Sequence, residues 1–116
     1  KASIKATLDN SGRAANITES VTVSTLAPEL LNEKEEKALF DAVSSCEDAI
    51  PALVESKDYS AVINSFAALN GVVEDFFDKI LVMDENEAVR QNRLALVKRY
   101  STVLSTYYKL DEITNA

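Results

Sequence analysis

The sequence has no histidine and only one cysteine, Cys46, among 116 residues. Without histidine the chain cannot build a Ser-His-Asp or Cys-His catalytic site, a phosphohistidine relay or a Glu-x-x-His di-iron centre. One cysteine is also too few for a structural zinc site. The two glycines, Gly12 and Gly71, stand apart, so there is no glycine-rich phosphate loop. We therefore predict no catalytic residue and no metal ligand in this chain.

Turn-forming residues and long apolar runs are also scarce. Two glycines and two prolines indicate long regular elements rather than a turn-rich β-sandwich. No apolar run approaches the roughly 18 residues of a membrane span, and the opening residues lack the apolar centre of a secretory signal. A lone cysteine forms no internal disulfide, so we expect a cytoplasmic protein that does not contact a membrane. At 116 residues the chain has the length of a single domain. Because it starts at Lys1 without Met, we expect this domain to be part of a longer protein.

Apolar residues recur at steps of three and four along most of the chain, which predicts three amphipathic helices. We expect helix N-caps at Asn32, Asp58 and Asp84, two of them followed three residues later by Glu. The three apolar stripes are Leu39, Val43, Cys46, Ile50 and Leu53; Tyr59, Val62, Ile63, Phe66, Leu69, Val73, Phe76, Phe77 and Ile80; and Val89, Arg93, Leu96, Tyr100, Val103, Tyr107 and Leu110.

The N-terminal segment has a weaker pattern. Residues 3–20 place apolar side chains at loosely helical spacing, but Asn10, Ser11 and Gly12 favour non-helical backbone in the middle. A frayed or broken helix is expected there, followed by an extended linker over residues 18–31. The predicted fold is all-α: an antiparallel helical bundle with three strong helices and a weaker N-terminal helix.

Charge is unevenly distributed over a chain whose formal net charge is −7. Residues 24–57 hold eight acids and three bases, whereas residues 84–110 hold three acids and five bases, with no acid from Arg90 to Lys109. The first and last helices can thus form a modest positive face beside an acidic middle hairpin. An acidic total weakens non-specific nucleic-acid binding, and we expect no DNA partner, but local contacts to looped-out RNA bases remain open. The alternative is a solvated last helix in which Lys and Arg lie toward the C-terminal end, because the helix dipole favours positive charge there.

Arg93 falls on the apolar face of the last helix, where a cation must be paired or must reach water along its stem. Asp75 and Asp78 precede the turn before this helix and are the predicted partners. This pattern favours a semi-buried ion pair locking the last two helices over a nucleic-acid contact.

Three stretches together resemble a known family: GRAANI, EKALF, and FFDKILVMDENEAVRQNRLALVKRY. They are similar to the C-terminal, DALR-like anticodon-binding helical domain of the bacterial-type glycyl-tRNA synthetase beta subunit. The resemblance covers about residues 4–110, and its specific part is residues 76–96. Gly12 departs from the pattern, since a Lys or similar residue is expected there, and the polar ending of the chain departs as well.

The resemblance implies that this domain holds the anticodon arm of glycine tRNA. The parent would be an ATP- and Mg-dependent ligase, an alpha-beta heterotetramer with catalysis in the alpha subunit and no cofactor in this domain. Arg13 and Asn16 match the family motif. On the last helix Arg90 is the best candidate for an RNA contact, and Lys5 and Lys79 would contact phosphates. Asn92 would read a base, or else cap or bridge helices. The implied RNA-binding residues are Lys5, Arg13, Asn16, Lys79, Arg90 and Asn92.

Two other functions fit the same residues. One is the anticodon domain of another DALR-type synthetase, such as the arginine enzyme, on the same fold. The other is a helical protein-interaction module that uses the acidic middle hairpin and binds no RNA.

Overall fold

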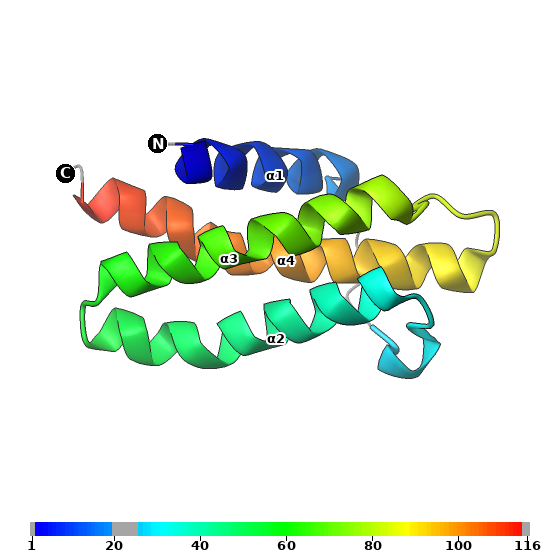
Figure 1. Ribbon diagram of the computed structural model, residues 1–116, viewed down its shortest axis with the longest axis horizontal. Coiled ribbons are helices and arrows are strands. Elements are labelled where there is room, and N and C mark those ends of the chain that lie inside the picture. The colour runs from blue at the N-terminus through cyan, green and yellow to red at the C-terminus, as the bar shows by residue number, and fades with distance from the viewer. Residues whose placement is uncertain (1, 20–25, 115–116) are drawn as a thin grey trace.

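The computed structural model describes the backbone of residues 2–19 and 26–114, and the side chains of residues 5–19, 26–29 and 31–104. Four α-helices and no strand occur in this part of the chain, which confirms the predicted all-α bundle (Figure 1). The elements are α1 (Ala2–Thr18), the 3-10 turn η1 (Pro28–Leu30), α2 (Lys34–Glu55), α3 (Tyr59–Lys79) and α4 (Glu87–Thr114).

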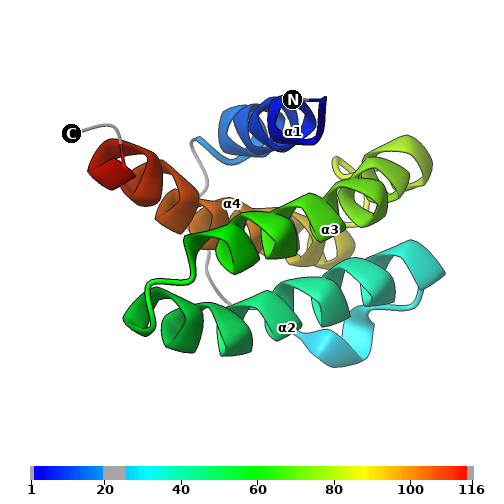
Figure 2. The ribbon, with the colours of Figure 1, turned by 60° about the vertical axis from the view of Figure 1, so that its left-hand side comes forward.

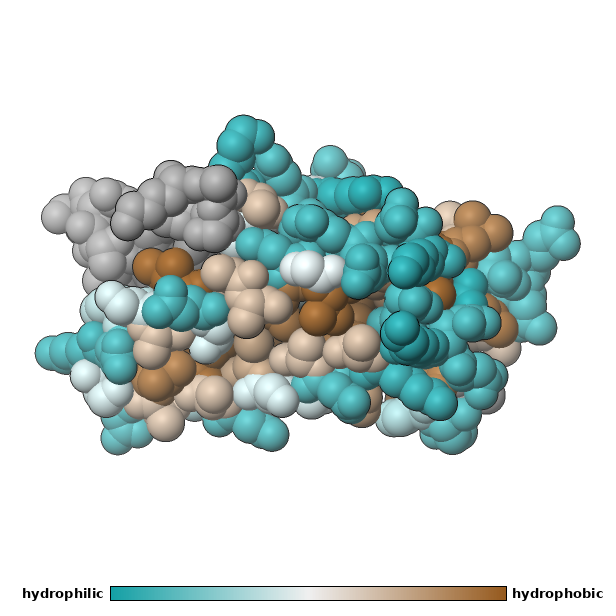
Figure 3. Space-filling model, in the orientation of Figure 1, coloured by the Kyte–Doolittle hydropathy of each residue, from teal (hydrophilic) through white to brown (hydrophobic). Residues whose placement is uncertain are grey.

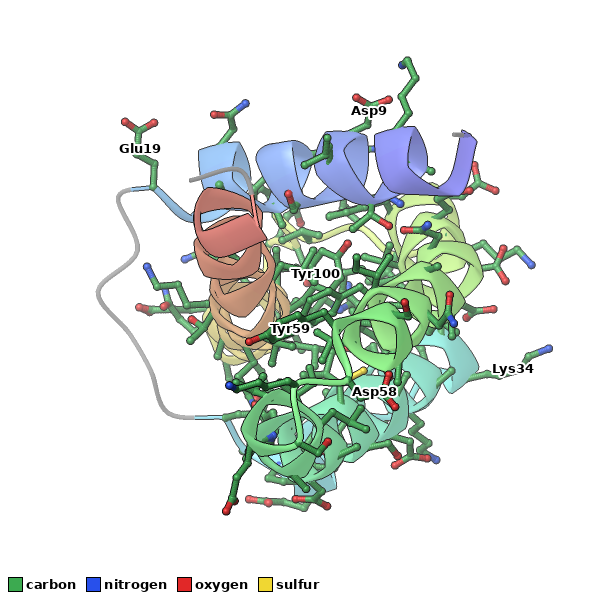
Figure 4. The ribbon with its side chains drawn as sticks, turned by 90° about the vertical axis from the view of Figure 1, so that its left-hand side faces the viewer. Asp9, Glu19, Lys34, Asp58, Tyr59 and Tyr100 are labelled. Carbon is green, nitrogen blue, oxygen red and sulfur yellow. The ribbon has the colours of Figure 1, made fainter. Side chains whose placement is uncertain are left out.

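The helices form an elongated bundle of 44 × 25 × 23 Å. Helices α1 and α2 lie on opposite sides, and each packs against both α3 and α4 (Figure 2). Helices α2, α3 and α4 run alternately in opposite directions along the long axis (Figure 1), whereas α1 crosses them obliquely, as the end-on view shows (Figure 4). The loop between α3 and α4 lies at the same end of the bundle as the start of α2, and Arg13 in the second half of α1 contacts Phe77 near this end. We call this end the loop end.

The core is built from the predicted apolar stripes. Leu39 and Val43 on α2 meet Phe66 and Val73 on α3, and all four are fully or almost fully buried. Tyr100 of α4 points into the centre, between all the helices (Figure 4). Cys46 is buried with them, as the helical spacing predicts. Burial in the core, and to a lesser degree the neighbouring Glu47 carboxylate, raise the pKa of the Cys46 thiol above its ordinary value.

Helix α4 is buried over a wider arc than its predicted stripe. Leu94, Ala95, Val97 and Leu104 are buried in addition to Leu96, Tyr100 and Val103 of the stripe. The cause is the position of α4 between α1 on one side and α2 on the other. A helix covered from two sides needs two apolar faces, whereas the single 4-3 stripe describes only one.

The prediction that α1 is frayed or broken is wrong: it is a continuous helix of 17 residues. It presents small side chains to the bundle, because Thr7, Ser11, Ala14 and Thr18 are all buried. The hydroxyl of Thr18 donates to the carbonyl of Ala14 at 2.8 Å, so burying it leaves no donor unsatisfied. Packing against α3 and α4 outweighs the low helix propensity of the middle of α1.

The segment between α1 and α2 is not extended throughout. Thr18 still belongs to α1, and Pro28–Leu30 form one turn of 3-10 helix. Proline at the start of such a turn supplies the fixed φ that the turn requires. Residues 20–25 of the predicted linker lie outside the described residues.

Helix caps occur close to the predicted positions. Asp58 caps α3, since its carboxylate accepts a hydrogen bond from the backbone N–H of Ala61 at 3.2 Å. The other two caps are each shifted along the chain. The capping box of α2 is Glu33 with Glu36 instead of Asn32 with Glu35. Asn86 caps α4 instead of Asp84, by accepting from the N–H of Val89 at 3.1 Å.

Candidate nucleic-acid interface

The loop between α3 and α4, residues 80–86, is held in place by two arginines of α4. Arg93 donates from Nη1 to the carbonyl of Leu81 at 2.7 Å, and Arg90 donates from Nη1 to the carbonyl of Asp84 at 3.1 Å. The Asp84 carboxylate in turn accepts the N–H of Asn86 at 2.8 Å. Contacts from two different turns of α4 therefore fix the loop, so a partner would meet it in a preformed shape.

Apolar side chains project from this fixed loop. The backbone at Ile80 is extended, and successive side chains alternate between core and solvent. Ile80 and Val82 are buried, whereas Leu81 and Met83 are 64% and 62% exposed, the highest values among the large hydrophobic residues of the described part. An apolar side chain held in solvent beside polar groups is typical of a contact surface, and it suits the flat face of an unstacked base.

Arg13 lies near the same end, on α1. Its guanidinium carbon is 4.4 Å from the centroid of the Phe77 ring of α3. Phe77 in turn meets the buried Phe76 ring edge-on, with the centroids 5.8 Å apart. Stacking fixes the plane of the exposed guanidinium and uses none of its N–H donors. Asn16, exposed three residues further along α1, lies on the same side of that helix.

The ion pair predicted for Arg93 forms, but Asp75 and Asp78 as its partners are wrong. Arg93 Nε bonds to the Glu36 carboxylate of α2 at 2.9 Å, with the two side chains only 11% and 3% exposed. Asp84 lies 3.5 Å from its Nη1. Asp75 and Asp78 sit on the exposed face of α3, whereas Arg93 points toward the first turn of α2. The pair thus locks α4 to α2, and not to α3.

Asn92 is a structural residue. It is 4% exposed, and its amide both accepts from the N–H of Ala27 at 2.7 Å and donates to the carbonyl of Ala27 at 3.1 Å. It therefore bridges α4 to the segment before α2, one of the two roles open to it from its sequence position. With its amide engaged inside the protein, it is not part of the interface.

The remaining predicted RNA contacts divide between two places. Lys79 ends α3 and Arg90 lies in the first turn of α4, so both flank the loop. The Lys79 ammonium is 4.0 Å from the Glu35 carboxylate and largely exposed. Lys5 is two turns before Arg13, about 12 Å along the axis of α1, and pairs with Asp9 at 2.9 Å. Lys5 therefore lies away from the loop end.

These observations define a candidate interface, which we call the loop-end surface. It has an apolar tip, oriented cations and an exposed amide on a rigid frame. Asp78, Glu85 and Glu87 are exposed at the same end, so the surface carries mixed charge and is no broad cationic patch. It comprises Arg13, Asn16, Phe77, Lys79, Leu81, Met83 and Arg90.

The described residues meet neither the requirements of a metal site nor those of a membrane-spanning helix. Across the described residues, no three His, Cys, Asp or Glu side chains come together as a set able to hold a metal ion. The helices described here are also too polar, or too short in their apolar stretches, for any of them to cross a membrane.

The class of this helical bundle follows from comparison with known protein families. The family model of the DALR anticodon binding domain matches residues 3–114, nearly the whole chain. The chain therefore belongs to the DALR anticodon binding domain family.

The curated proteins that resemble this chain include glycine–tRNA ligase beta subunits. The chain is 31% identical over 102 residues to the glycine–tRNA ligase beta subunit of Geotalea daltonii, a match of 88% of this chain and 15% of that subunit. It is 40% identical over 96 residues to the glycine–tRNA ligase beta subunit of Anaeromyxobacter sp. strain K, covering 80% of this chain and 14% of that subunit. The chain thus spans about one seventh of the relatives that it matches. No solved structure matches it significantly.

Proposed function

We propose that this chain holds the anticodon arm of glycine tRNA, as the anticodon-binding domain of a glycine–tRNA ligase beta subunit. The observation that carries this proposal is the family match over residues 3–114, together with relatives that bear that subunit's name. Those names favour glycine over the arginine alternative. The protein-interaction alternative explains neither the family match nor the oriented Arg13.

The loop-end surface supplies the contacts that such docking needs. Recognition of a single-stranded loop depends on unstacked bases that meet apolar or planar side chains, with hydrogen bonds to their edges. Leu81 and Met83 offer the apolar faces, and Asn16 offers an amide for a base edge. We expect Arg13, Lys79 and Arg90 to contact the flanking phosphates, and such contacts set position rather than sequence preference.

The chemistry of the ligase lies elsewhere in this proposal. ATP, Mg and glycine would bind in the alpha subunit of an alpha-beta heterotetramer, in the cytoplasm. This chain would position the tRNA so that its acceptor end reaches that distant site. Its contribution is therefore to tRNA affinity, and the activation of glycine by ATP should not depend on it.

Replacing Arg13 by alanine tests this division directly. We expect the KM for glycine tRNA in the assembled ligase to rise about fivefold to tenfold, the loss of roughly one charged contact. Glycine-dependent exchange of pyrophosphate into ATP should be unchanged. Both rates are measured on the same enzyme preparation.

The matched control is Lys57→Asn, at the opposite end of the bundle in the turn between α2 and α3. It removes the same charge, and asparagine tolerates the positive φ of 62° found at this position. The control should leave the KM for tRNA unchanged. Equal effects of the two variants, or an unchanged KM in Arg13→Ala, would remove Arg13 from the interface.

A further inference from the structure

A shallow groove of about 290 Å³ runs between α2 and α3 on the face turned away from α1 and α4. Its walls carry small side chains, and Cys46 and Leu69 form its buried floor. Figure 3 shows this face, with tan and brown residues along the middle and hydrophilic residues around them. The lining residues are Ala42, Ser45, Cys46, Ala49, Ser65, Ala68 and Leu69.

The helices that form the groove carry most of the negative charge of the molecule. Residues 34–79 contain ten acids and four bases, a net charge of −6 in a chain of −7. Asp41 and Asp48 are exposed on α2 and lie seven residues apart, which puts them on one side of that helix. Asp75 is exposed on α3. The apolar groove thus has an anionic border.

This charge decides what can cover the groove. An RNA backbone would meet repulsion along both helices, and a second copy placed face to face would bring another −6 against the first. A segment that covers apolar surface here must bring positive charge at its edges. A helix suits the shape, because small side chains on the two helices leave room for the large side chains of a third.

We propose that the groove between α2 and α3 docks a cationic amphipathic helix of another polypeptide segment. Its leucine-type side chains would enter the groove over Ala49 and Ala68. Its Lys or Arg side chains would border the stripe and meet Asp41, Asp48 and Asp75. The α2–α3 face then joins the domain to protein, while the loop end stays open to RNA.

The test uses two synthetic helical peptides with the same leucine stripe, one bordered by lysine and the other by glutamate. We expect the chain to bind the lysine peptide at least about tenfold more tightly in fluorescence anisotropy at low salt. The advantage should fall as salt rises, because exposed charges are screened. Equal binding of the two peptides, or no binding of either, would overturn the proposal.

Groove variants locate the binding. Ala68→Gln places a long neutral side chain in the groove at an exposed helical position. We expect this variant to bind the lysine peptide at least about tenfold more weakly than the unaltered chain does. Ala15→Gln makes the same change on the exposed face of α1 and should have no effect. Equal affinities of the two variants would place the peptide outside the groove and contradict the proposal.

Two further measurements separate this proposal from the RNA-binding function. Sedimentation of the chain with the peptide should give a single chain with bound peptide, whereas a dimer would identify a second copy as the occupant. The affinity of Ala68→Gln for the anticodon stem-loop should equal that of the unaltered chain. A loss there would make the groove part of the RNA surface instead. Failure of RNA binding in every variant would count against the RNA function alone.

Discussion

Replacing Arg93 by methionine is expected to lower the free energy of unfolding by about 3–5 kcal/mol. Methionine keeps the stem of the side chain but leaves the Glu36 carboxylate, 2% exposed as a residue, without its cation. A buried charge that loses its partner carries the whole cost of its desolvation. The variant also removes the bond that holds the carbonyl of Leu81. Urea unfolding followed by circular dichroism measures the change.

The matched control is Arg99→Met. Arg99 also pairs with a glutamate of α2, Glu47, but these side chains are 28% and 35% exposed. Water already solvates them, so we expect a loss below about 1 kcal/mol. The double variant Arg93→Met with Glu36→Gln should recover part of the loss of the single variant. Equal costs for the two arginines would show that burial of the Glu36 pair does not govern stability.

Phe76→Ala, as a separate single variant, is expected to lower the free energy of unfolding by about 3–5 kcal/mol, because it removes a fully buried ring and leaves a cavity. The neighbouring Phe77 is only partly buried, so Phe77→Ala should cost about 1–2 kcal/mol. The same unfolding experiment compares the two. Similar losses would mean that the two rings share the core equally.

In RNA binding the order of the two phenylalanines should be reversed, with the larger effect from Phe77→Ala. Phe77→Ala removes the ring on which the Arg13 guanidinium lies, and so should raise the KM for tRNA as Arg13→Ala does. If Phe77→Ala leaves that KM unchanged while Arg13→Ala raises it, the ring has no part in orienting the arginine.

Periodic burial made most of the fold predictable from the sequence. Leu39, Phe66, Val73 and Tyr100 lie in stripes of steps three and four, and each is buried as this spacing requires. The same logic missed Val97, because a stripe describes contact with one side and α4 has neighbours on two. It also undervalued α1, whose helix depends on contacts with α3 and α4 that its local sequence does not show.

The site was predictable only where it is local. Arg93 was identifiable as a paired cation from its place on an apolar face. Its partner Glu36 lies 57 residues earlier in the chain, and only the packing of α2 against α4 brings the two together. Leu81 and Met83 belong to an unbroken apolar run, residues 80–83, and nothing in that run distinguishes the buried side chains from the exposed ones. Only the end of α3 and the path of the loop decide that Ile80 and Val82 are buried while Leu81 and Met83 face solvent.

We propose that RNA docks on the loop-end surface of this bundle. The most direct test is a titration of the 15N-labelled chain with the anticodon stem-loop of glycine tRNA, followed by NMR amide shifts. We predict shifts concentrated at Arg13, Asn16, Phe77 and residues 80–90, with the α2–α3 groove unchanged. Shifts centred on Ala49 and Ala68, or none at saturating RNA, would contradict the claim.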